Sequence, residues 1–310
     1  MYDKVKIWLD RAMVGEQFPT IANYLNNTKM QVNLQTGEEK TFGSLDGLKV
    51  SILESGISIE GSLPKYLYGN NVYKFDRRAT AQAIEKLSDT LHIEANKAKV
   101  NSIEFGTNFL MKHQVSEYLL KLGEMPRLER YLFEPTSLYY KSKQSQKVFA
   151  FYDKNKEIQA NNIELSEISK NDNLLRYEMR LKNRLPAQLK VPEVTASTLS
   201  DKHFYKMMVK LYKERYFSIQ KAKQIKANYM SEIKTVQDAY DAFVANLISQ
   251  NDQRQEYLRE LKRANVFTDR KNYTRLKDKL ERTCTKANFT ASDELMSELD
   301  NEIKNCGAYI

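Results

Sequence analysis

Polar and apolar residues alternate along several segments in the first half of the chain, as in strands with one buried face. Residues 4–9 (KVKIWL) alternate in this way, and residues 49–60 (KVSILESGISIE) predict a hairpin that turns near Ser55–Gly56. The same reasoning predicts further strands over residues 102–110, 137–140, 147–152 and 174–181. Helical spacing of apolar positions predicts helices over residues 76–97, with Asp76 as N-cap, and over residues 115–122.

The pattern changes after residues 186–198 (LPAQLKVPEVTAS), which read as a linker. Residues 199–310 contain almost no Gly or Pro, and they predict helices such as 201–224 and 236–249. We therefore expect an α+β domain over residues 1–185 and an all-α, basic domain over residues 199–310.

The charge of the chain is unevenly distributed. The 310 residues include 49 Lys and Arg against 40 Asp and Glu, and between residues 202 and 282 the counts are 19 and 10. A basic excess of this kind is typical of proteins that bind a polyanion such as DNA. Two isolated cysteines and no apolar stretch of membrane-spanning length predict a reducing, cytoplasmic setting without a membrane.

One predicted strand carries its charges on a single face. In residues 175–182 (LRYEMRLK), Arg176, Glu178, Arg180 and Lys182 share one face, and apolar residues occupy the other. The charged face is expected to line either a cleft or the solvent-exposed side of the sheet.

Two further residues are candidates for chemistry. Tyr152 ends the aromatic strand 148–152, where it acts as a nucleophile or as a core tyrosine with its hydroxyl at the rim. Glu104 lies in mid-strand, so it either needs partners or a metal, or else faces solvent from an edge strand. The chain has no paired histidines, glycine-rich phosphate loop or Gly-x-Ser-x-Gly motif, which excludes the usual ATPase, kinase and serine-hydrolase sites.

The order of four segments resembles the replication initiators of filamentous phages, of the gene II protein type, and more distantly rolling-circle plasmid initiators of the Rep_trans kind. The segments are residues 61–72 (GSLPKYLYGNNV), 103–104 (IE), 148–157 (VFAFYDKNKE) and 175–184 (LRYEMRLKNR). The resemblance covers residues 1–185 and implies an antiparallel-sheet nicking domain of the atypical HUH-like or Rep type.

This resemblance implies a site-specific DNA endonuclease and strand transferase that starts rolling-circle replication. Tyr152 would attack one strand, which leaves a 5′-phosphotyrosyl link and a free 3′-hydroxyl, while Lys154 and Arg180 hold the phosphate. Mg²⁺ or Mn²⁺ would be bound by Glu104, Glu157 and Glu178. The family pattern at the first of these is Arg-Ile-Asp, whereas this chain has Ser102-Ile103-Glu104.

The expected partners are single- and double-stranded DNA at a replication origin, together with a host helicase and polymerase. The predicted DNA contacts combine a turn-prone loop with the charged strand: Lys65, Tyr66, Tyr68, Asn70, Asn71, Arg176, Lys182 and Arg184. The basic helices between residues 202 and 282 would bind duplex DNA or dock the catalytic domain. Two alternatives remain open, a mobilisation relaxase of similar chemistry and a DNA-binding regulator without catalysis.

Overall fold

The computed structural model describes residues 1–71, 74–133, 136–160, 173–221, 223–225, 229–250, 254–284 and 290–307. The chain divides into two compact units. The first contains residues 1–120, 124–219 and 301–310, and the second contains residues 121–123 and 220–300. The first unit combines helices with a large antiparallel sheet, so the predicted α+β class is confirmed.

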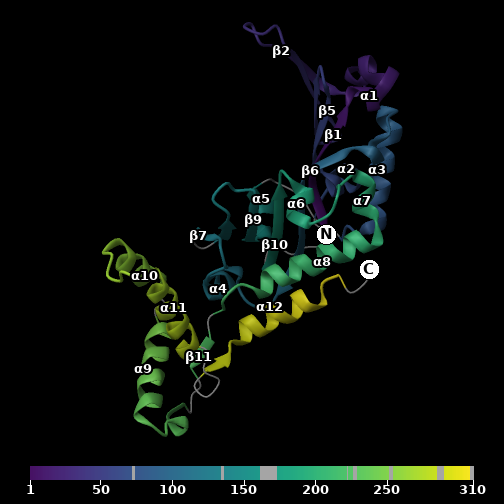
Figure 1. Cartoon of the computed structure of the whole chain (residues 1–310). Coiled ribbons are helices and arrows are strands. Elements are labelled where there is room, and N and C mark those ends of the chain that lie inside the picture. Colours follow the sequence, from purple (N-terminus) through teal and green to yellow (C-terminus); the bar gives the residue numbers. More distant parts are fainter. Residues whose placement is uncertain are drawn as a thin grey trace. The chain divides into compact units, whose positions relative to one another are not determined.

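The first unit is built on a ten-stranded sheet in the order β2-β3-β4-β5-β1-β6-β10-β9-β8-β7 (Figure 1). Its strands are β1 (Tyr2–Asp10), β2 (Asn26–Val32), β3 (Glu39–Leu45), β4 (Leu48–Leu53), β5 (Gly56–Ser62), β6 (Lys99–Met111), β7 (Glu129–Phe133), β8 (Ser137–Lys141), β9 (Lys147–Asp153) and β10 (Asn173–Lys182). Every neighbouring pair is antiparallel. Strands β1, β6 and β10 are neighbours in the middle of the sheet, although they are far apart in the sequence.

All the strands predicted from alternation are present, including the β4–β5 hairpin with its turn at Glu54–Ser55. Three strands of the ten-stranded sheet were not predicted: β2, β3 and β7. All seven residues of β2 are exposed, so its sequence lacks the alternation that a half-buried strand shows.

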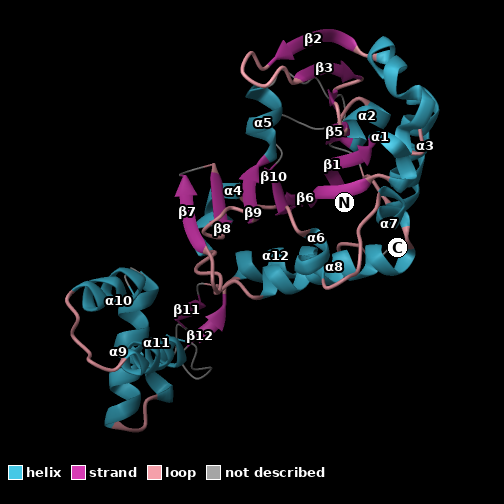
Figure 2. Cartoon of the chain, turned by 45° about the horizontal axis from the view of Figure 1, so that its top comes forward, coloured by secondary structure: helices cyan, strands magenta, loops and turns pink. Residues whose placement is uncertain are grey.

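The helices of the first unit connect the strands and cover the sheet (Figure 2). They are α1 (Arg11–Val14), η1 (Gly15–Tyr24), α2 (Leu63–Tyr68), α3 (Arg77–Leu91), η2 (Ala95–Lys97), α4 (Val115–Lys121), α5 (Lys154–Ala160), α6 (Leu185–Leu189), α7 (Ala196–Ser200), α8 (Lys202–Phe217) and the end of α12 (Glu294–Asn305). Asp76 caps α3 as predicted, because its carboxylate accepts a hydrogen bond from the Ala79 amide. The helix ends at Leu91, earlier than predicted, where His92 takes a left-handed conformation with φ of 54°.

Helix α8 covers one face of the sheet and closes the main core (Figure 1). The Tyr212 hydroxyl donates to the carbonyl of Tyr177 on β10 at 2.9 Å, and the two rings stack with centroids 4.2 Å apart. Met208 and Tyr216 on the same helix are also fully buried. Because α8 completes this core, the first unit extends to Ile219, beyond the boundary predicted at residue 185. The predicted linker 186–198 includes most of α6 and the start of α7.

The second unit is mostly helical. It contains η3 (Tyr229–Glu232), α9 (Val236–Gln250), α10 (Arg254–Arg263), α11 (Arg270–Cys284) and the start of α12. The strands β11 (Lys223–Ile225) and β12 (Thr290–Ser292) pair in a small antiparallel sheet, which corrects the all-α prediction and shortens the helix predicted over residues 201–224. Within the described ranges, no helix combines the length and apolar character needed to cross a bilayer.

The packing of α8 gives a stability prediction. Tyr212→Ala should lower the free energy of unfolding by about 3–5 kcal/mol, because it removes a buried aromatic ring that the sheet cannot replace. Lys210→Ala on the exposed side of the same helix is the matched control, and we expect a change below about 0.5 kcal/mol. Urea unfolding with a constant m-value measures both. Equal losses for the two variants would contradict the assigned packing.

Candidate active site

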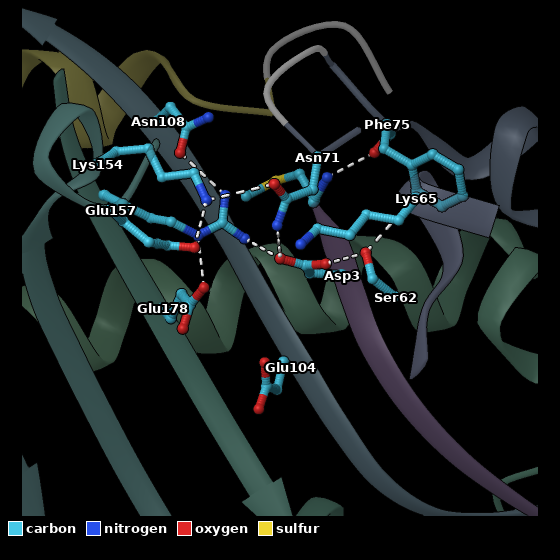
Figure 3. A network of polar contacts seen from close by, with 12 residues as sticks. Asp3, Ser62, Lys65, Asn71, Phe75, Glu104, Asn108, Lys154, Glu157 and Glu178 are labelled. Carbon is cyan, nitrogen blue, oxygen red and sulfur yellow. Dashed lines mark hydrogen bonds and ion pairs between the residues drawn. The ribbon is translucent and has the colours of Figure 1, made fainter. Parts of the chain in front are cut away.

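A pocket of about 510 Å³ lies on the face of the sheet opposite to α8, where β1, β6, β8, β9 and β10 contribute side chains. Tyr152, Glu104, Glu157, Glu178 and Arg180 all line it, so the structure brings together five of the six residues predicted for catalysis or metal binding. Figure 3 shows several of these side chains and the polar network behind them. Four cationic and five acidic side chains line this pocket, which makes its formal charge negative.

Glu178 is the centre of the polar network. Its side chain is 3% exposed, and its Oε1 accepts from the Arg176 Nε at 2.5 Å, while Oε2 accepts from the Arg180 Nη2 at 2.6 Å. Burial alone would favour the neutral acid, but the two guanidinium groups outweigh it and lower the pKa of Glu178 to about 2. The carboxylate is therefore charged at neutral pH. Opposite it in the sheet stands Gly106, where a Cβ would lie 2.8 Å from the Glu178 Cγ.

Arg176 extends this network towards β1. Its Nη1 donates to the Asn108 Oδ1 at 2.9 Å, and its Nη2 forms an ion pair with Asp3. Asp3 also accepts from the Asn71 Nδ2 at 2.9 Å and from the Ser62 hydroxyl at 2.5 Å. The Arg176 side chain is 4% exposed, and its two acidic partners, Asp3 and Glu178, are buried with it. It was predicted to contact DNA, and the structure places its guanidinium among protein partners.

Tyr152 projects from β9 into the same network. Its hydroxyl donates to the Glu178 Oε1 at 2.9 Å. Burial and the charge of Glu178 together raise its pKa well above the ordinary tyrosine value, although Arg176 opposes this. The phenol is therefore neutral in this arrangement, and its hydrogen bond fixes the direction of the hydroxyl. The side chain is half-buried and lines the pocket, a position that either alternative for Tyr152 requires, so its role as nucleophile stays a prediction.

Lys154 and Glu157 begin α5, directly after β9. The Lys154 Nζ donates to the Glu157 Oε1 at 3.0 Å and to the Asn71 Oδ1 at 3.3 Å, and its side chain is 1% exposed. Burial and the nearby Arg176 lower the pKa of Lys154. The buried Lys154 is not part of the pocket lining, whereas Arg180, with 27% of its side chain exposed, lines the pocket.

Glu104 comes from the central strand β6 rather than from an edge strand. Its carboxylate is 3.8 Å from the Arg180 Nε, and burial together with the charge of Glu178 raises its pKa. Across the residues that the structure describes, no three His, Cys, Asp or Glu side chains form a group that could hold a metal ion. Glu157 and Glu178 are engaged by cations of the protein, whereas Glu104 has a longer ion-pair contact, so the assignment of these three carboxylates as metal ligands stays a prediction.

The remaining predicted DNA contacts fall in three places. The segment predicted as a loop forms α2, on which Lys65 and Tyr68 are exposed, but Tyr66 is buried at 2% under the Lys86 ammonium. Asn71 belongs to the network described above, and Asn70 is half-buried beside it in the chain. Lys182 and Arg184 lie at the exposed end of β10, away from the buried network.

The sequence analysis missed several residues of this site. Asp3 and Lys4 are two consecutive polar residues in an otherwise alternating strand, and this break in the pattern marks the irregular register of β1 with β6. Tyr139 on β8 also lines the pocket, whereas its neighbour Tyr140 is fully buried. Gly106 gave no signal in the sequence, because its need for a small side chain depends on the strand paired with it.

The depressed pKa of Glu178 predicts a pH-dependent stability. Its ion pairs should stabilise the fold by on the order of 3 kcal/mol above pH 4.5, and this stability should be lost as the pH falls towards 2. Glu178→Gln should remove this part of the acid dependence and destabilise the protein at pH 7, since two guanidinium groups lose their anion.

Unfolding free energies measured from pH 2 to pH 7 test this assignment. Glu54→Gln, at an exposed turn, should give a curve parallel to that of the unsubstituted chain. If the curve for Glu178→Gln is also parallel, the carboxylate does not hold the network together.

Comparison with known protein families supports the resemblance that the sequence motifs indicate. A search of curated proteins finds no significant match. The family model that describes the N-terminal region of the phage replication-associated protein of the gene II type matches residues 1–214, which include the whole sheet and most of α8. The chain therefore belongs to this family of phage replication-associated proteins, the filamentous-phage gene II type of initiator that its sequence motifs resemble.

Proposed function

We propose that the protein nicks one DNA strand at a replication origin, with Tyr152 as nucleophile, and so initiates rolling-circle replication of a phage or plasmid. The observation that carries this proposal is the hydrogen bond from the Tyr152 hydroxyl to a charged, immobilised Glu178 inside a pocket lined by Arg180. Family membership supports a part in replication. The local geometry supports tyrosine chemistry, because the hydroxyl has one fixed orientation towards the pocket.

In the proposed reaction, the Tyr152 oxygen attacks a backbone phosphorus and the bond from phosphorus to the 3′ oxygen breaks. The strand on the 5′-phosphate side becomes linked to the tyrosine, and the proton lost by the phenol is balanced by the proton that the 3′ oxygen gains. One phosphodiester is exchanged for another, so rejoining needs no nucleotide cofactor. This agrees with the lack of a phosphate-binding loop motif in the sequence.

Arg180 is the cation best placed to contact the reacting phosphate. Its guanidinium is held by Glu178 and reaches the pocket, so it can donate to phosphate oxygens as negative charge develops. Lys154 acts more indirectly in this proposal, because its buried ammonium fixes Glu157 and Asn71. Glu178 orients the phenol and is too weak a base, with a pKa of about 2, to hold its proton.

We also propose that the reaction depends on Mg²⁺ or Mn²⁺. The support is the set of acidic side chains in the pocket, which outnumber the cationic ones by five to four where an incoming phosphate is itself negative. A bound divalent cation would offset this repulsion and polarise the phosphate. Glu104 is the candidate ligand whose carboxylate has the longest ion-pair contact of the three, at 3.8 Å. The released 3′-hydroxyl would then be extended by a host polymerase, while a host helicase separates the strands.

The nucleophile is tested on supercoiled DNA of the replicon that encodes the chain, incubated with Mn²⁺. Tyr152→Phe should form no covalent protein–DNA adduct and no nicked circles, because the attacking oxygen is gone, while it still binds the DNA. Tyr139→Phe is the matched control from the same pocket, and it should still nick. Adduct formation by Tyr152→Phe at the unsubstituted level would exclude the mechanism. Binding without any adduct in the unsubstituted chain would favour a regulator.

The cation is tested by calorimetric titration with Mn²⁺ in the absence of DNA. Glu104→Gln should weaken binding at least about ten-fold, because a carboxylate ligand is replaced by a neutral amide. The control is Glu94→Gln, an exposed glutamate that pairs with Lys97 on the surface. Unchanged affinity in Glu104→Gln would remove this residue from the proposed ligands.

A further inference from the structure

The half of the sheet that does not carry Tyr152 presents a second polar surface. Because paired residues of neighbouring strands point to the same side, the strand register defines which side chains share this surface. One row across the strands is Lys29, Phe42, Ser51, Ser58, Trp8 and Lys99. The adjacent row is Asn26, Ser44, Lys49, Glu60, Lys6, Ser102 and Lys182. We call these two rows, with Lys4 opposite Ser62, the lysine face.

The lysine face has an excess of positive charge. Its one acidic residue, Glu60, is held by Lys4 at 3.2 Å and by Lys6 at 3.5 Å. Lys29 and Lys49 are exposed, and neither takes part in an ion pair among the residues that the structure describes. Most of its uncharged positions are serines, which donate readily to phosphate oxygens. This composition is complementary to a nucleic-acid backbone.

Two aromatic rings lie within the lysine face. Trp8 and Phe42 share one row and are half-buried, with three strand spacings, or about 14 Å, between them. The Trp8 Nε1 donates to the Asp10 Oδ1 at 2.8 Å, which fixes the indole ring. Only Ser58 and Ser51 separate the two rings in this row, so a chain that crosses the row meets little steric obstruction. Aromatic rings alternating with cations are typical of surfaces that bind unpaired strands.

The lysine face is continuous with the candidate active site. A groove of about 420 Å³ runs over it and is lined by Lys6, Lys29, Phe42, Lys49 and Glu60, among others. Lys4 and Ser62, which stand next along β1 and β5, line the pocket of Tyr152. A strand lying in the groove therefore leads directly to the candidate nucleophile.

We propose that the lysine face binds an unpaired DNA strand and guides it into the pocket of Tyr152. Bases contact Trp8 and Phe42, and phosphates contact Lys6, Lys29 and Lys49. An unpaired strand fits better than a duplex, because the Tyr152 hydroxyl is recessed in the sheet and the bases of a duplex are already stacked on each other. The identity of the ligand as DNA rests on the proposed function, whereas the surface itself is defined by the strand register.

The experiment uses a natural reporter, because Trp8 is the only tryptophan of the chain. The full chain is titrated at low salt with a thymidine oligomer of about twelve nucleotides, within the site sizes known for single-strand binding surfaces. The divalent cations are removed with a chelator, so that no cleavage takes place. We expect saturable quenching of Trp8 fluorescence, a dissociation constant that rises with salt, and no quenching by a duplex of equal length.

Substitutions test whether the lysine face, and not another part of the protein, binds the strand. The double variant Lys29→Gln, Lys49→Gln and the variant Phe42→Leu should each raise the dissociation constant about ten-fold, while their unfolding midpoints stay close to that of the unsubstituted chain. Lys143→Gln, an exposed lysine outside the lysine face, is the matched control and should leave the constant unchanged.

The outcomes also distinguish this proposal from the nicking reaction. The proposal that the lysine face binds an unpaired strand would be contradicted by any of three results. These are no quenching, equal quenching by the duplex, or undiminished affinity of the lysine double variant. Quenching with the expected loss in these variants would support it, even if no covalent adduct with Tyr152 were found. In that case the proposal of a strand-binding surface would be supported and the proposal of Tyr152 as nucleophile would be contradicted.

Discussion

The buried carboxylate of Glu178 is the interaction on which the candidate site depends. A single charge in the middle of a ten-stranded sheet is costly, and here two guanidinium groups offset that cost. The same carboxylate holds the Tyr152 hydroxyl of β9, and Arg176 links it to Asp3 of β1. Strand β1 is thus joined to β9 and β10, which come from a distant part of the sequence, through one ionised side chain. Gly106 completes this arrangement, because a side chain on β6 would occupy the space of Glu178.

The two faces of the sheet have different roles in the first unit. One face carries aromatic rings such as Tyr177, which pack against α8 in the main core. The other face carries the polar network of the pocket and the lysine face, which also includes the rings of Trp8 and Phe42. Five acidic and four cationic side chains line the pocket of Tyr152, whereas lysines outnumber acidic residues on the lysine face. The charge of the lysine face is therefore more favourable for a polyanion than the charge of the pocket.

Helix α8 shows why a boundary between units is hard to place from composition. The change to a Gly- and Pro-poor sequence after residue 198 is real, but α8 belongs to the core of the sheet through Met208, Tyr212 and Tyr216. Composition reports which residues form helices, whereas the boundary depends on where those helices pack. The matched family region, residues 1–214, also includes most of α8.

The sequence by itself determined the strands with one buried face, the cap of α3 and the shared face of Arg176, Glu178 and Arg180, because period-two alternation and capping are local properties. Motif order identified the family and singled out Tyr152. Only the tertiary structure decided that Arg176 and Lys154 are buried, that Asp3 joins them, and that Trp8 and Phe42 share a row with Lys29. These facts depend on which strands become neighbours, and the contact between Arg176 and Asp3 joins residues 173 positions apart, a separation that no local pattern encodes.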